Sequence, residues 1–115
     1  MIVYLGDFFD KSELNAMEIT AIRDLRWAKK IPHYFLVGNH ELYSKSENIS
    51  LNSLNVLSGI KDFYILYCPF QLDNLYFIPY DNYKGDKIED IFSFLKRPFP
   101  KENVIIFSHN DIKGL

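Results

Sequence analysis

A helical stretch between two short apolar runs is the feature that most constrains this fold. Residues 1–5 and 34–37 are apolar and rich in β-prone side chains, and each run ends at a glycine. In residues 12–30 the apolar side chains recur at spacings of three and four, Ser12 can cap the start, and Pro32 follows the end. Two strands joined by a helix of this length pair in parallel through a right-handed crossover. The sequence therefore predicts an α/β fold in which both strands end at the same edge of a sheet.

The rest of the chain continues this alternation without a linker or an internal repeat. Pro69 ends one apolar run and Asp73-Asn74 precedes the next, so these two runs are predicted to be a hairpin or neighbouring strands. We predict one domain over residues 1–115, with a mixed sheet of about five strands and two to three helices. The further predicted elements are strands at 62–68, 75–78 and 104–107, a short helix that includes Ile49, Leu54 and Leu57, and a helix that Asp86 caps, with Ile88, Ile91, Phe92 and Leu95 on its apolar face.

Polar side chains follow three of the predicted strands at the point where each strand ends. Asp7 and Asp10 come after the first strand, Asn39 and His40 after the second, and His109 after the last. Each break alone is typical of an ordinary turn, because glycine, asparagine and aspartate tolerate positive φ. Together they form a set of oxygen and nitrogen donors at the edge where open α/β sheets bind ligands. Such a mixed set suits Mn, Fe or Zn better than Ca.

Charge and cysteine usage exclude some classes of function. Thirteen Lys and Arg against fifteen Asp and Glu give a net charge of −2, so the basic footprint of a duplex-binding protein is missing. Cys68 is the only cysteine, which excludes an internal disulfide and agrees with a cytoplasmic location. No apolar run approaches the roughly 18 residues of a membrane span, so no membrane partner is expected. We interpret His33, beside Pro32, as a structural residue.

The three polar breaks resemble blocks of the calcineurin-like metallophosphoesterases. The matching residues are Gly6-Asp7-Phe8-Phe9-Asp10, Gly38-Asn39-His40-Glu41 and His109, in the family's order and at similar spacing. The resemblance spans almost the whole chain and implies an αββα sandwich that holds two divalent metal ions, Mn, Fe or Zn. It also implies that the substrate is a phosphoester, either a monoester or a diester.

The resemblance implies a role for each matching residue. Asp7 would bridge both metals, and Asn39 and His109 would bind one of them. His40 would stay off the metal and protonate the leaving oxygen as a general acid, with Asp10 hydrogen-bonded to it. Two neighbouring cations would clamp the attacking and leaving oxygens of an in-line displacement and activate the bridging water.

Two blocks of the family pattern are missing from this sequence. No Asp-x-His block precedes Asp7, and no Gly-His-x-His block follows His109. One metal would therefore keep Asp7, Asn39 and His109, whereas the other would keep only the shared Asp7. We expect the chain to be an internal piece of a metallophosphoesterase, incomplete at both ends, with little or no activity of its own. Glu41 matches a variable acidic position and is given only a supporting role.

Other interpretations stay open at this point. Phe77-Ile78-Pro79-Tyr80 is similar to a segment of the SbcD-type DNA exonucleases and endonucleases, for which nucleic acid is the substrate. The run from Ser108 to Gly114 is similar to a form seen in phage-encoded members of the family. A different class is a non-catalytic α/β module that binds a partner or a nucleotide at the same edge. The metal interpretation requires the donor atoms of the three predicted ligands to converge on one spot.

Overall fold

The computed structural model describes residues 1–39, 52–80, 88–94 and 96–110, and it places their strands in two separate sheets. The first sheet consists of β1 (Ile2–Tyr4), β2 (His33–Leu36) and β3 (Phe63–Leu66), in that order. The second consists of β4 (Phe70–Leu72), β5 (Leu75–Ile78) and β6 (Ile105–Ser108). The helices of the described part are α1 (Ala16–Arg23), the 3₁₀-helix η2 (Ser53–Leu57) and α2 (Ile88–Phe94).

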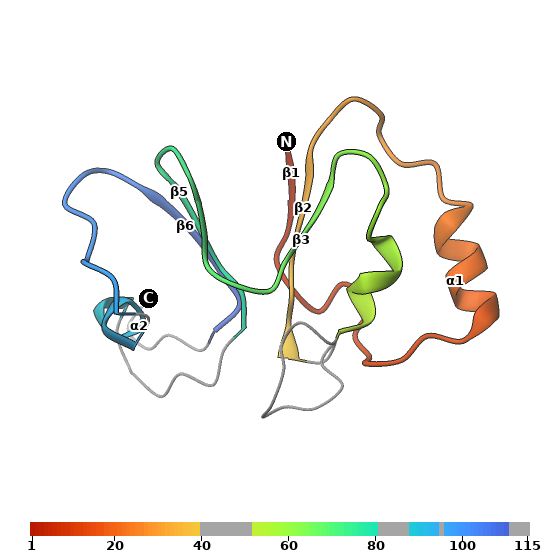
Figure 1. Ribbon diagram of the computed structural model, residues 1–115, viewed down its shortest axis with the longest axis horizontal. Helices are drawn as coiled ribbons and strands as arrows, with labels where there is room; N and C mark the ends of the chain where they lie inside the picture. Colours follow the sequence, from red (N-terminus) through yellow and green to blue (C-terminus); the bar gives the residue numbers. More distant parts are fainter. Residues whose placement is uncertain (40–51, 81–87, 95, 111–115) are drawn as a thin grey trace.

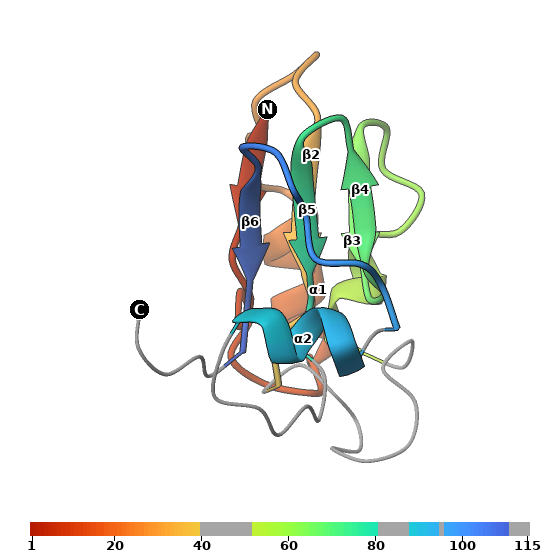
Figure 2. The ribbon, with the colours of Figure 1, turned by 90° about the vertical axis from the view of Figure 1, so that its left-hand side faces the viewer.

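The two sheets lie face to face between two helical layers, so the fold is an αββα sandwich (Figure 1). α1 and η2 lie on the outer side of the first sheet, and α2 lies on the outer side of the second. Viewed through the layers, β6 lies over β1, β5 over β2 and β4 over β3 (Figure 2). The predicted α/β class and sandwich architecture are confirmed, whereas the prediction of one mixed sheet is wrong because the strands divide into two sheets.

The alternating side chains of β2 show how the first sheet is buried on both faces. Phe35 belongs to the apolar cluster that includes Leu54 and Leu57 of η2. Its neighbours Tyr34 and Leu36 belong to a second cluster, which fills the space between the sheets. All five of these side chains are at most 8% exposed. An unbroken apolar run is therefore required here, because each successive residue of a central strand meets a different apolar layer.

Parallel pairing brings the carboxyl ends of most strands to one side of the sandwich. β1, β2 and β3 pair in parallel, with Val3 opposite Tyr34 and Tyr34 opposite Tyr64. β5 and β6 also pair in parallel, with α2 between them in the chain, and only β4 runs antiparallel to its neighbour. The predicted βαβ start with parallel strands is confirmed. The loops after β1, β2 and β6 consequently meet at one edge, which positions the candidate site.

The predicted pairing of residues 62–68 with residues 75–78 is wrong. Residues 63–66 form β3 beside β2, whereas residues 75–78 form β5 of the other sheet. β5 instead makes its hairpin with β4, and Asp73-Asn74 is the turn between them, with Asp73 at φ 51°. The sequence did not predict β4, because its three residues are all exposed and show no alternation of buried and exposed positions. The strand directly follows Pro69, where the chain passes from one sheet to the other.

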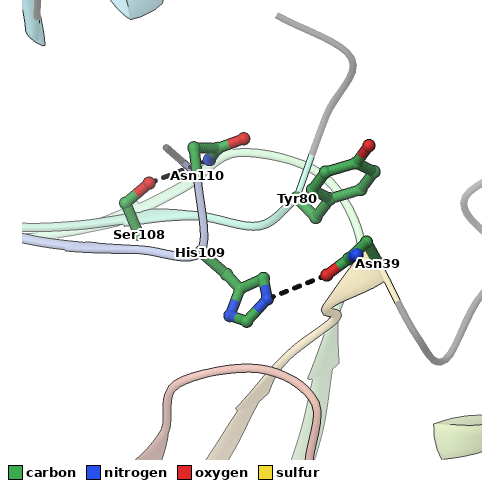
Figure 3. Close-up of a pocket in the computed structure, with 5 residues that line it drawn as sticks. All are labelled: Asn39, Tyr80, Ser108, His109 and Asn110. Atoms are coloured by element: carbon green, nitrogen blue, oxygen red, sulfur yellow. Dashed lines mark hydrogen bonds between the residues drawn. The ribbon is translucent and has the colours of Figure 1, made fainter. Parts of the chain in front are cut away.

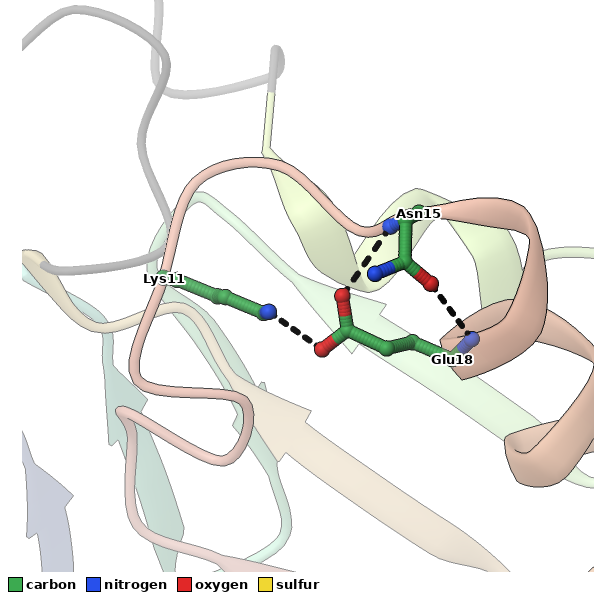
Figure 4. A network of polar contacts seen from close by, with 3 residues as sticks. All are labelled: Lys11, Asn15 and Glu18. Carbon is green, nitrogen blue, oxygen red and sulfur yellow. Dashed lines mark hydrogen bonds and ion pairs between the residues drawn. The ribbon is translucent and has the colours of Figure 1, made fainter.

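The first helix is shorter than the sequence pattern predicted. α1 begins after Asn15, whose side-chain oxygen accepts a hydrogen bond from the Glu18 backbone N–H at 2.9 Å. The Glu18 carboxylate accepts one in return from the Asn15 N–H at 3.1 Å, and it also pairs with Lys11 (Figure 4). This capping box replaces the predicted cap at Ser12. The predicted apolar stripe is wrong as well, since Met17 is 84% exposed and α1 contains no buried residue.

An aromatic side chain ends α1 early. The carbonyl of Ile22 accepts hydrogen bonds from the Leu25 N–H at 3.2 Å and from the Trp27 ring N–H at 3.3 Å. These bonds occupy the carbonyl that the next helical turn would need. The Trp27 ring packs edge-on against Phe63, with ring centroids 5.0 Å apart, so packing on the first sheet takes precedence over helix propensity.

The remaining predictions agree where the structure describes them. Leu54 and Leu57 are buried in η2, and Ile91 and Phe92 are buried in α2. The predicted contributions of Ile49, Asp86 and Leu95 fall outside the described residues. In the part of the chain that is described, no helix is both long and apolar enough to span a bilayer.

Candidate functional site

Two glycines allow the loops after β1 and β2 to approach the site closely. Gly6 has φ +95°, and a Cβ added there would lie 2.2 Å from Nδ1 of His109. A Cβ added at Gly38 would lie 2.2 Å from the Asp7 carboxylate and 2.4 Å from the Asp7 backbone nitrogen. Both separations are shorter than any non-bonded contact allows. The histidine and the aspartate therefore occupy space that only glycine leaves open.

Three predicted ligands converge at this edge of the sandwich. Nε2 of His109 lies 3.1 Å from a carboxylate oxygen of Asp7. It also lies 3.2 Å from the side-chain oxygen of Asn39, a contact drawn in Figure 3. The residues follow β6, β1 and β2, so the cluster joins both sheets. The side chains of His109 and Asp7 are 26% and 24% exposed, which leaves the cluster open to a ligand from solvent.

A backbone carbonyl fixes the orientation of the His109 ring. Nδ1 lies 2.8 Å from the carbonyl oxygen of Leu5, and it must donate there because a carbonyl only accepts. In the neutral ring Nε2 then carries the lone pair, and this lone pair faces the oxygens of Asp7 and Asn39. Three electron-pair donors that meet at one spot form a pocket that can hold a metal ion. A carbonyl behind the ring is also the usual outer partner of a metal-binding histidine.

A cavity of about 370 Å³ opens beside these donors, lined by Asn39, Tyr80, Ser108, His109 and Asn110 (Figure 3). Asn110 holds the loop after β6 in place, because its amide donates to Ser108 Oγ at 2.8 Å and to the Pro79 carbonyl at 3.1 Å. The Tyr80 N–H donates to the Val37 carbonyl at 2.9 Å and ties the second sheet to the first. Sequence reasoning assigned no role to Tyr80 or Asn110, since neither contributes to a periodic pattern.

The other predicted site residues have different outcomes. Asp10 lies in the loop after β1, exposed and at φ 56°. His40 and Glu41 lie outside the described residues, and so does the predicted pair of Asp10 with His40. His33 is 1% exposed, and its ring nitrogens lie 3.0 Å from the Tyr4 hydroxyl and 2.9 Å from the Ala28 carbonyl. These contacts agree with a structural role for His33.

The donor atoms present fit a divalent transition metal ion. A carboxylate oxygen, an amide oxygen and an imidazole nitrogen form a mixed set that suits Mn, Fe or Zn. Among the described residues, no group of three or more His, Cys, Asp and Glu side chains gathers at one point, so the amide of Asn39 has to supply the third donor.

Comparison with known families agrees with this arrangement. The family model described as calcineurin-like phosphoesterase matches residues 1–114. The chain belongs to that family. Its members hydrolyse phosphoesters with the help of divalent metal ions, so this phosphoesterase domain carries the fold and the class of chemistry expected from its three polar breaks. No curated protein and no solved structure matches the chain.

Proposed function

We propose that this phosphoesterase domain binds a divalent metal ion through Asp7, Asn39 and His109 and hydrolyses a phosphoester beside it. The observation that supports the proposal most is the convergence of these donors within 3.2 Å of Nε2 of His109. The bound metal would polarise the phosphoryl oxygens and lower the pKa of an attacking water. The 370 Å³ cavity beside the donors has room for a phosphoryl group and part of the alcohol it is attached to.

Each of the three ligands has a distinct part in this proposal. Asp7 supplies the negative charge that offsets the metal ion, and Gly38 lets its carboxylate reach the site. His109 is kept in the metal-binding orientation by its bond to the Leu5 carbonyl. Asn39 supplies a neutral oxygen, so the metal keeps more positive charge for the substrate than a second carboxylate would leave it.

The general acid of the proposed reaction is His40. It follows the ligand Asn39 directly in the chain, which keeps it within reach of the same edge of the sheet. A histidine that is not bound to the metal can donate a proton to the leaving oxygen near neutral pH. Asp10 is the proposed partner that orients it. Its loop leaves the same edge at the end of β1.

A second metal ion has fewer ligands in this chain. Asp7 is the one residue proposed to bridge both ions, and the sequence contains no Asp-x-His or Gly-His-x-His block to complete the second site. We therefore expect that one ion binds weakly through three ligands, that the second ion is not retained, and that this chain on its own has little or no hydrolytic activity. The net charge of −2 favours small phosphoesters over nucleic acid, and the single Cys68 agrees with a cytoplasmic location.

Calorimetry with Mn²⁺ tests the proposed site. Asp7→Ala and His109→Ala are each expected to weaken binding of the first ion by at least about tenfold, in line with the loss of a metal ligand or its close support. Asp73→Asn is the matched control, because Asp73 lies in the β4–β5 turn and asparagine tolerates its φ of 51°. Unchanged Mn²⁺ affinity in both alanine variants would overturn the assignment.

Hydrolysis of a chromogenic phosphodiester tests the chemistry separately. We expect at most a low Mn²⁺-dependent rate, which His40→Asn should reduce by about 10²-fold or more, as for loss of a general acid. The same variant should retain Mn²⁺ affinity in calorimetry, since His40 is not proposed as a ligand. A fall in rate and in affinity together would show that His40 binds the metal instead.

A further inference from the structure

A larger cavity lies at the opposite end of the first sheet. It measures about 710 Å³, and its lining comes from the connection between α1 and β2 and from the turn before β3. Both segments lead into the amino ends of their strands, whereas Asp7, Asn39 and His109 follow carboxyl ends (Figure 1). The phosphoesterase chemistry proposed above makes no use of this cavity.

Apolar and aromatic side chains form much of the lining of this cavity. Trp27 and Phe63 line it together with Leu25 and Ile60, and the rings of Trp27 and Phe63 meet edge-on at 5.0 Å. The Trp27 ring is held by its hydrogen bond to the Ile22 carbonyl. A preformed cavity of this size with rigid aromatic walls is typical of a site for a small molecule rather than for an extended polymer.

The charged residues of the cavity lining, here called its rim, are mostly basic. Arg26, Lys29, Lys30 and Lys61 line it, against a single acidic residue, Asp62. The lining therefore carries a net charge of +3, so the rest of a chain whose net charge is −2 must carry −5. Within the described part of the chain, none of these four cationic side chains is in an ion pair. Four cations with no ion-pair partner among the described residues favour an anionic ligand in this cavity.

The backbone holds the two lining segments in fixed positions. Lys30 and Asp62 both have positive φ, 61° and 66°, and mark the tight turns that lead into β2 and β3. The N–H of His33 donates to the Asp62 carbonyl at 2.8 Å, which joins the two segments directly. The backbone of the two segments that carry the basic residues and the aromatic walls is therefore in place before any ligand binds.

We propose that this cavity binds a small anion that carries a planar aromatic ring, of which a nucleoside diphosphate is the natural representative. The ring has apolar walls to pack against, and the phosphates have a rim of four cations. This binding site is separate from the proposed metal centre and does not depend on phosphoester hydrolysis. Its position at the far end of the strands makes it a site for an effector rather than for the substrate.

Trp27 fluorescence provides a direct test, because it is the only tryptophan in the chain. Titration with ADP in the presence of EDTA is expected to give a saturable change in Trp27 emission. Adenosine lacks the anion and pyrophosphate lacks the ring, so each should bind at least about tenfold more weakly than ADP, the equivalent of about 1.4 kcal/mol. Equal binding of pyrophosphate and ADP, equal binding of polyglutamate, or no saturable binding by fluorescence and calorimetry would overturn the proposal.

Charge variants locate the binding within the molecule. The double variant Lys29→Gln with Lys61→Gln should weaken ADP binding at least about tenfold, whereas Lys101→Gln, an exposed lysine elsewhere, should leave it unchanged. Circular dichroism checks that the double variant remains folded. Asp7→Ala should retain full ADP affinity, since the ligand itself contains phosphate and could otherwise occupy the metal centre. Loss of ADP binding in Asp7→Ala would overturn the proposal while leaving the metal site intact as a hypothesis.

Discussion

A histidine lies at each end of the sandwich, His33 at the amino end of β2 and His109 after the carboxyl end of β6, and the two differ in what faces their rings. At the amino end, both nitrogens of His33 are paired with protein atoms, the Tyr4 hydroxyl and the Ala28 carbonyl, and the ring is buried against Tyr4. At the carboxyl end, Nδ1 of His109 contacts the Leu5 carbonyl, whereas Nε2 faces the oxygens of two predicted metal ligands, Asp7 and Asn39. The comparison shows that a histidine can bind a metal ion when one ring nitrogen is fixed by a carbonyl and the other faces further metal-binding oxygens.

The largest expected effect comes from exchanging each histidine for alanine. His109→Ala should weaken Mn²⁺ binding at least about tenfold and lower the unfolding free energy by only about 1 kcal/mol, because its partly exposed ring loses one bond to the Leu5 carbonyl. His33→Ala should leave Mn²⁺ binding intact and lower the unfolding free energy by about 2–3 kcal/mol, through lost packing and unsatisfied partners. Calorimetry and urea denaturation measure the two quantities. If His33→Ala abolished metal binding in a folded protein, the division between the two ends would not hold.

A glycine exchange tests how the carboxyl end is built. Gly38→Ala places a methyl group on the Asp7 backbone and carboxylate, so we expect about 1–3 kcal/mol of destabilisation together with loss of Mn²⁺ affinity. Gly59→Ala is the control, since a Cβ there meets nothing within 4 Å. Its positive φ should cost about 1 kcal/mol without any effect on the metal. Equal Mn²⁺ affinity in both variants would show that Asp7 does not need the space at Gly38.

The amino end can be probed through its tyrosine. Tyr4→Phe removes the hydroxyl that pairs with His33 and should cost about 1 kcal/mol in unfolding free energy. Burial raises the pKa of Tyr4 in the folded state, so its neutral form is favoured by folding. The resulting contribution to the unfolding free energy is fully present below pH 10 and is lost as the pH rises through the raised pKa of Tyr4. Denaturation between pH 8 and 11 should therefore show a steeper loss of stability in the wild type than in Tyr4→Phe.

The smallest effect is expected at α1, which belongs to neither end. Asn15→Ala removes half of the capping box and should cost about 1 kcal/mol without changing metal or nucleotide binding. Its partner Glu18 has a lowered pKa, chiefly because its carboxylate pairs with Lys11. The resulting stabilisation is present above pH 4.5 and is lost as the pH falls through the lowered pKa. Thermal melts of Glu18→Gln should thus differ from the wild type at pH 6 and converge with it near pH 3.

Residue patterns predicted the parallel βαβ start and the convergence of three side chains, whereas the sandwich was predicted only from the resemblance to a known family. Parallel pairing followed from the length of the connection before β2, and the polar residues followed the strand ends. The residues that fix the geometry could not be predicted in this way. Leu5 acts through its carbonyl and Gly38 through a missing side chain, so neither leaves a chemical signature in the sequence.

Local patterns misled the prediction where tertiary packing overruled them. The apolar spacing of residues 12–30 indicated one long helix, but Trp27 packs on the first sheet and ends α1 at Arg23. The hairpin was assigned to the wrong strands because periodicity states which residues are buried and not which sheet buries them. The turn at Asp73 was nevertheless predicted correctly, since turn chemistry is local.

The bond from His109 to the Leu5 carbonyl joins residues 104 positions apart in the chain and closes the edge between the two sheets. Contacts of such long range form late in folding, after the costly closure of the loop between them. A metal ion held there would therefore act mainly on the unfolding rate and leave the folding rate almost unchanged. The predicted result is a protein that becomes long-lived, rather than quick to fold, once its metal is bound.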